Sequence, residues 1–186
     1  MQPGPRTSKP LIRVGLMVGV VSAVISGDAG LAVTDPSGAH LAAISAGESW
    51  QTVIAGSGVA VRGPGAGSSA SEMIDVAGAD TGALVRVNGR PYRGVIEIFR
   101  DRTGLTVVNR LPMEAYLLGV VSTEMGRRAP NELEALRAQA VVSRTYALRH
   151  LRTDQGELGM HLPRLDVTVL LRQCLVQRHS PETRGA

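Results

Sequence analysis

The feature that most constrains the fold is a long series of short aliphatic runs separated by glycine-containing turns. Between residues 11 and 61, runs rich in Val, Ile and Ala alternate with Gly27-Asp-Ala-Gly, Asp35-Pro-Ser-Gly and Gly56-Ser-Gly. This punctuation is typical of strands linked by hairpins. Strand patterns resume over residues 84–92, 94–100 and 105–109. The sequence therefore predicts antiparallel β hairpins, or a barrel-like sheet, over more than half of the chain.

The beginning of the chain allows two interpretations. Residues 1–10 contain three prolines and are expected to form a flexible leader. The apolar run from Leu16 to Ile25 follows three basic residues, as the core of a signal peptide does. At about ten residues the run is too short for a transmembrane span. Its alternation of side chains favours strands, and a signal sequence remains the alternative.

The rest of the chain contains one glycine-rich segment and two predicted helices. Residues 63–71 consist of Gly, Pro, Ser and Ala, and they predict a flexible loop or a subdomain boundary. Pro112 fits the first turn of a helix that would run to about Thr123. A second helix is expected from Pro130 and Asn131 to about Leu151.

The second predicted helix carries an apolar stripe bordered by arginines. Four residues share one side at helical spacing and are expected to form the core contact: Leu133, Leu136, Ala140 and Ala147. Arg137 and Arg144 lie beside this stripe, so we expect their guanidinium groups to contact a carboxylate, a carbonyl or a ligand oxygen. Together these patterns predict an α+β fold in which the hairpins precede a packed helical pair.

Composition excludes several functional classes. Hydrophobic residues make up 44% and charged residues 19% of the 186 residues, which is a globular composition. The chain has one Trp, three Tyr and one Phe, too few for a base-stacking surface, so no nucleic-acid partner is expected. The single cysteine excludes an internal disulfide framework, and the four histidines lack metal-ligand spacing. We expect neither a metal nor a cofactor.

The charge of the chain permits an anionic partner. The formal net charge is +4, and Lys9 is the only lysine among 20 basic residues. Such a surface attracts anionic polymers, including cell-wall glycans that carry carboxylates.

Several short blocks occur in an order that resembles a known family. The blocks are Tyr92-Arg-Gly, Val107-Val-Asn, Tyr116-Leu-Leu-Gly-Val-Val, Glu124-Met and Glu134-Ala-Leu-Arg-Ala-Gln-Ala-Val-Val-Ser-Arg-Thr-Tyr-Ala-Leu. They resemble stage II sporulation protein D and its relatives, the LytB-type amidase enhancers. The resemblance implies a domain over residues 11–160 that matches best over 84–150. Residues 161–186 are then an atypical tail, as expected of a C-terminally truncated domain.

The resemblance implies an extracytoplasmic function in the cell envelope. The family's sporulation protein is a lytic transglycosylase that cuts peptidoglycan glycan strands stripped of their stem peptides. By the same resemblance Glu124 is the acid, Arg144 is a functionally important arginine, and Arg137 occupies a basic position. The alternatives are a non-catalytic amidase enhancer, with an N-acetylmuramoyl amidase as its partner, and an inactive remnant.

The chemistry of a lytic transglycosylase is compatible with one acid. Hydrolytic glycosidases generally need two carboxylates, whereas here the C6 hydroxyl of the sugar replaces the attacking water. We expect apolar neighbours such as Val120 and Met125 to keep Glu124 protonated for this role, and Gln139 to bind sugar hydroxyls. Three other acids are expected at exposed strand or helix-start positions, outside any matching motif: Glu97, Asp101 and Glu114.

Overall fold

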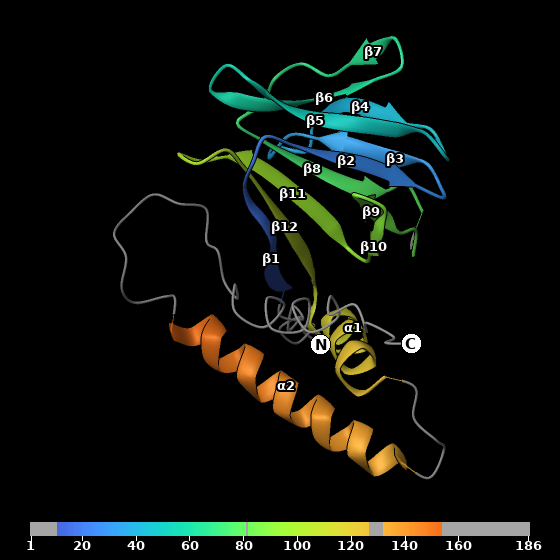
Figure 1. Cartoon of the computed structure of the whole chain (residues 1–186), viewed down its shortest axis with the longest axis vertical. Coiled ribbons are helices and arrows are strands. Elements are labelled where there is room, and N and C mark those ends of the chain that lie inside the picture. The colour runs from blue at the N-terminus through green and yellow to red at the C-terminus, as the bar shows by residue number, and fades with distance from the viewer. Residues whose placement is uncertain (1–10, 81, 127–131, 154–186) are drawn as a thin grey trace, which may run out of the picture. The chain divides into compact units, whose positions relative to one another are not determined.

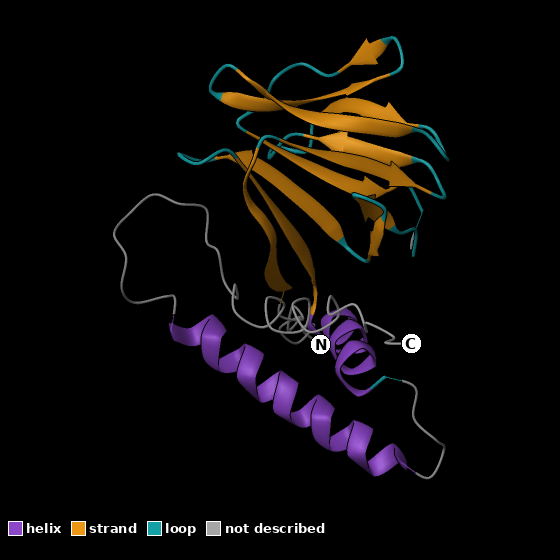
Figure 2. Ribbon diagram, viewed as in Figure 1, coloured by secondary structure: helices purple, strands orange, loops and turns teal. Residues whose placement is uncertain are grey.

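The computed structural model describes residues 11–80, 82–126 and 132–153. It divides the chain into a strand unit that ends at Ala115 and a helical unit that begins at Tyr116. Figures 1 and 2 show strands in the first and helices in the second. The α+β class predicted from the sequence is confirmed.

The strand unit contains two antiparallel six-stranded sheets. The first sheet has the order β1 (Leu11–Val20), β12 (Leu105–Pro112), β11 (Val95–Arg100), β8 (Met73–Gly78), β3 (Leu31–Thr34) and β4 (His40–Ile44). The second has the order β10 (Arg90–Tyr92), β9 (Val85–Val87), β2 (Ser22–Gly27), β5 (Ser49–Ala55), β6 (Gly58–Gly63) and β7 (Ala66–Gly67). Within the described residues each sheet begins and ends on a different strand. The structure is thus open, and the barrel-like alternative is wrong.

One apolar cluster joins the two sheets. Inward-facing residues such as Ile98 and Val107 of the first sheet belong to the same buried cluster as Ile25 and Val85 of the second. Each fully buried Val or Ile side chain stabilises the fold by about 1.5 to 3 kcal/mol. Period-two alternation places these residues on the inner faces, which makes the strand unit a β-sandwich.

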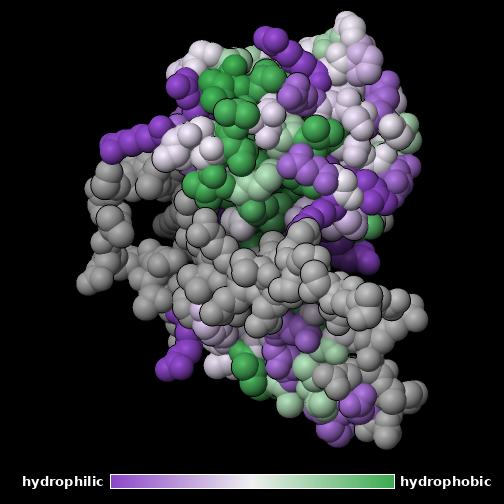
Figure 3. Space-filling model, viewed as in Figure 1, coloured by the Kyte–Doolittle hydropathy of each residue, from purple (hydrophilic) through white to green (hydrophobic). Residues whose placement is uncertain are grey.

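The apolar run near the beginning of the chain forms strands. It contributes the end of β1 and most of β2, where Ala23 and Ile25 are buried. The strand interpretation of residues 11–26 is confirmed. Figure 3 shows that apolar side chains also reach the surface, and the exposed large ones of the strand unit are Leu11, Val18, Val21, Val24 and Ile54.

Two local predictions differ from the structure because of turn chemistry. The run over residues 84–92 is a hairpin of β9 and β10, because Asn88 and Gly89 both adopt positive φ, at 49° and 79°. This is the requirement of a two-residue hairpin turn that follows strand twist. Residues 63–71 also return along the sheet: β7 pairs with β6, and Ser71 bonds to the backbone of Val59. Ala66, Gly67 and Ser71 are therefore tied to the sheet, whereas residues 68–70 between them form a loop.

The helical unit contains most of α1 (Met113–Met125) and all of α2 (Leu133–Thr153). Both predicted helices exist, but Pro112 is the last residue of β12 and not the first of the helix. The predicted start of the second helix at Pro130 and Asn131 lies outside the described residues, as do the leader 1–10 and the tail 161–186.

The buried side of α2 contains most of the predicted stripe: Ala147 is buried, and Leu136 and Ala140 are half-buried. Ser143 and Ala147 are buried, whereas Leu133 is 48% exposed. Val141 and Leu148, which flank the stripe, are exposed as well. The helical period and the buried side were therefore predicted correctly except at Leu133, and the sequence missed Ser143, which lies on the same side.

Candidate functional site

The carboxyl group of Glu124 lies one residue before the end of α1 and is half-buried. The side-chain amide of Gln139, on α2, donates a hydrogen bond from Nε2 to Glu124 Oε2. Gln139 is also half-buried. The structure therefore brings together two of the predicted site residues, Glu124 at the end of α1 and Gln139 in α2.

Ser143 extends this contact. Its hydroxyl oxygen lies 3.5 Å from Gln139 Nε2 and is the second acceptor for that amide. The spacing i, i+4 places Gln139 and Ser143 on one face of α2, and Ser143 is 4% exposed. Ser143 was not among the predicted site residues, although its spacing from Gln139 was a usable signal.

The two predicted arginines have different environments. Arg137 is exposed, and its guanidinium pairs with Glu134 at 2.6 Å. The expected contact of Arg137 with a carboxylate is thus present, but at the solvent-exposed side of α2. Arg144 is half-buried on the same helix. Helical geometry places Arg137 and Gln139 about 200° apart around the axis, so Arg137 does not share the Gln139 contact.

The other candidate acids have structural surroundings. Glu97 is 5% exposed, so the expectation of an exposed strand position is wrong. Asp101 Oδ1 accepts hydrogen bonds from the backbone N and the hydroxyl of Thr103 and closes the turn between β11 and β12. Glu114 is exposed in the first turn of α1.

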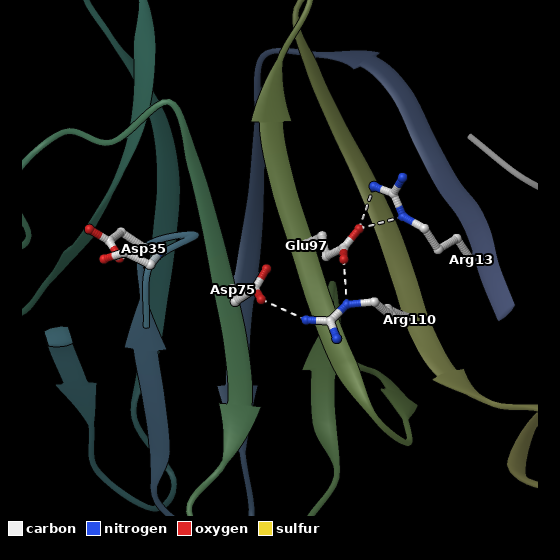
Figure 4. A network of polar contacts seen from close by, with 6 residues as sticks. Arg13, Asp35, Asp75, Glu97 and Arg110 are labelled. Atoms are coloured by element: carbon white, nitrogen blue, oxygen red, sulfur yellow. Dashed lines mark hydrogen bonds and ion pairs between the residues drawn. The ribbon is translucent and has the colours of Figure 1, made fainter. Parts of the chain in front are cut away.

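Glu97 belongs to an ion network that crosses four adjacent strands (Figure 4). Its carboxylate accepts hydrogen bonds from Arg13 Nε, at 2.7 Å, and from Arg110 Nε. Arg110 Nη2 also contacts Asp75 Oδ2 at 2.7 Å. Arg13 lies directly opposite Arg110, and Glu97 directly opposite Asp75. These like-charged pairs are compatible with the sheet because each arginine contacts a carboxylate. Glu97 is thus a structural residue.

The pKa values of Asp75 and Asp35, both in the strand unit, are displaced in opposite directions. Burial raises the pKa of Asp75, against the opposing effect of Arg110. The hydroxyl of Ser37 lowers the pKa of Asp35, as does the backbone N–H of Ala39. Because the pKa of Asp75 is raised in the folded protein, Asp75 contributes stability at pH values below its pKa in the unfolded chain. This contribution is lost as pH rises through its pKa in the folded protein. Because the pKa of Asp35 is lowered in the folded protein, Asp35 contributes stability at pH values above its pKa in the unfolded chain. This contribution is lost as pH falls through its pKa in the folded protein.

We therefore expect Asp75→Asn and Asp35→Asn to change the pH dependence of stability with opposite signs. The free energy of unfolding of the wild type, relative to Asp75→Asn, should fall as pH rises above about 4. Relative to Asp35→Asn, it should fall as pH decreases below about 4. Urea unfolding of the full chain at a series of pH values measures both differences. Parallel curves for the two variants would contradict these assignments.

No metal site is evident in the described part of the chain: it contains no group of three or more His, Cys, Asp or Glu residues that could hold a metal ion. Neither described helix is long and apolar enough to cross a membrane.

Comparison with known proteins gives a family match over the region that contains α1 and α2. Residues 101–174 match a family model described as stage II sporulation protein, SpoIID. An uncharacterized protein of Brachyspira hyodysenteriae is 39% identical over 72 residues, which is 39% of this chain and 19% of that protein. The chain thus spans about a fifth of the length of this relative. No solved structure matches. The family match extends past α2 into the tail, where the sequence showed little resemblance.

Proposed function

Because residues 101–174 belong to the stage II sporulation protein D family, we propose that the chain is a lytic transglycosylase that cuts peptidoglycan glycan strands. The family match supports a sporulation-related, cell-wall-associated role. The observation that carries the finer proposal is the hydrogen bond from Gln139 to Glu124, because it orients the carboxyl group of the Glu-Met motif. The proposed location is outside the cytoplasmic membrane, where peptidoglycan lies.

One carboxyl group suffices for the proposed reaction. Glu124 protonates the bridging glycosidic oxygen, and the bond from that oxygen to the anomeric carbon breaks. The C6 hydroxyl of the same muramic acid residue attacks the anomeric carbon and returns its proton to the Glu124 carboxylate. The product is a 1,6-anhydro ring, and no water is consumed. The intramolecular hydroxyl supplies the proximity that a bound water would otherwise need.

The hydrogen bond from Gln139 assigns different tasks to the two oxygens of Glu124. Oε2 accepts the amide N–H, as the carbonyl-like oxygen of a protonated carboxyl group can. The transferable proton then resides on Oε1. This division lets one glutamate act first as general acid and then as base.

Arginines of α2 are the proposed contacts for the anionic groups of the substrate. The planar guanidinium of Arg144 suits the lactyl carboxylate of muramic acid, which it can bind through two parallel hydrogen bonds. The exposed Arg137 would add a longer-range attraction to the glycan, in competition with Glu134.

Digestion of peptide-free glycan strands by the full chain tests the proposal. We expect 1,6-anhydro-muramic ends in the mass spectrum of the products, with fewer from strands that retain stem peptides. Binding to the strands without cleavage, together with stimulation of an added N-acetylmuramoyl amidase, would favour the enhancer function instead. Neither cleavage nor binding would contradict both functions.

A further inference from the structure

The amide nitrogen of Gln139 has two acceptors within the helical unit. One is Glu124 Oε2, and the other is the hydroxyl oxygen of Ser143 at 3.5 Å. A primary amide carries two N–H donors, so these two contacts can use both. A nitrogen engaged in this way has no further hydrogen to donate to a sugar hydroxyl.

The acceptor also determines which way the amide faces. Oε2 of Glu124 carries no proton in either state of the proposed reaction and only accepts hydrogen bonds, so the Gln139 carbonyl oxygen would be repelled at the position of Nε2. Ser143 is almost fully buried on the same face of α2, and it supplies a second fixed acceptor for the same nitrogen. The Gln139 side chain is therefore held from both sides.

We propose that Gln139 and Ser143 are a positioning pair for Glu124, in which Gln139 orients the carboxyl group and Ser143 orients Gln139. For its effect on turnover, this inference rests on the proposed function of Glu124. It replaces the expectation that Gln139 binds substrate, and it gives Ser143 a role that the sequence did not assign.

A positioning residue and a binding residue have different kinetic signatures. Gln139→Met keeps the length of the side chain and removes its donors. It should lower kcat by about 10- to 100-fold with little change in KM, because a small misplacement of a catalytic group has an effect of this size. Ser143→Ala should lower kcat by less, about 3- to 10-fold. A rise in KM with unchanged kcat would show that Gln139 binds the sugar and would overturn the proposal.

Two matched controls separate this effect from nonspecific damage. Gln51→Met makes the same change at an exposed glutamine of β5 that donates to Ser22. Thr145→Ala removes an exposed hydroxyl of α2 that donates only to its own helix, at the carbonyl of Val141. Both should leave kcat unchanged. If Gln139→Met does not fold, Gln139→Leu tests the same point, since leucine has no donor either.

A second measurement judges the pair independently of catalysis. The side-chain amide protons of Gln139 are followed by ¹H–¹⁵N NMR of the full chain. We expect one proton signal to move in Glu124→Ala and the other in Ser143→Ala, while Thr145→Ala moves neither. If both signals stay unchanged in the first two variants, the pair does not exist and the proposal is overturned. If the signals move but the wild type cleaves no glycan, the proposed function fails and the structural pair stands.

Discussion

Glu124→Gln is expected to abolish nearly all formation of 1,6-anhydro ends. The substituted amide has almost the same size and can still accept a hydrogen bond from Gln139, but it has no acidic proton for the glycosidic oxygen. General acid–base catalysis contributes about 10² to 10⁴ in rate, so kcat should fall by that factor. Mass spectrometry of the products over time measures the loss.

Binding to the glycan provides the comparison for this variant. Because the substitution leaves the arginines of α2 in place, Glu124→Gln should bind purified sacculi as well as the wild type. Glu134→Gln, at an exposed glutamate of α2, is the matched control and should retain turnover. If Glu124→Gln retains turnover within about twofold, the general-acid assignment is wrong.

Glu97→Gln is expected to cause the largest loss of stability among single changes of charge in the strand unit. The Glu97 side chain is 6% exposed and contacts Arg13 and Arg110, which are 15% and 30% exposed. Removing one partner of a buried ion pair leaves an uncompensated charge and typically costs about 3 to 5 kcal/mol. The free energy of unfolding, measured in urea, should fall by this amount.

The control for Glu97 is an ion pair at the surface. Asp28 contacts Arg86 at 2.7 Å, and its side chain is 70% exposed. Surface ion pairs contribute little because water and salt screen them, so Asp28→Asn should change the stability only slightly. Equal losses for Glu97→Gln and Asp28→Asn would contradict the structural role of the network.

Much of the fold followed from local patterns. Glycine turns and period-two alternation predicted the strands, including the run at residues 11–26. The change to a helical period predicted α1 and α2 to within a few residues. These features depend on neighbours in the sequence, and each run carries its own signal.

The features that escaped prediction depend on partners far apart in the sequence. The sequence predicted that Glu97 is exposed. Its contact with Arg13, 84 positions away, forms only when β1, β12 and β11 pair in the correct register. In α2, the apolar stripe predicted the buried side at Ala147, but Leu133 is exposed and the polar Ser143 is buried on that side. The sequence motif marked Glu124, whereas its orientation by Gln139 required the helices to be placed in three dimensions.

The central claim is that Glu124 acts alone and that the attacking group is the substrate's own C6 hydroxyl. Digestion of peptide-free glycan strands by the wild-type chain in heavy-oxygen water tests it most directly. We predict 1,6-anhydro ends that lack one water relative to a reducing end and contain no heavy oxygen at the anomeric carbon. Cleavage that forms new reducing ends in place of anhydro ends would show that water attacks, which requires a second carboxylate and contradicts the account.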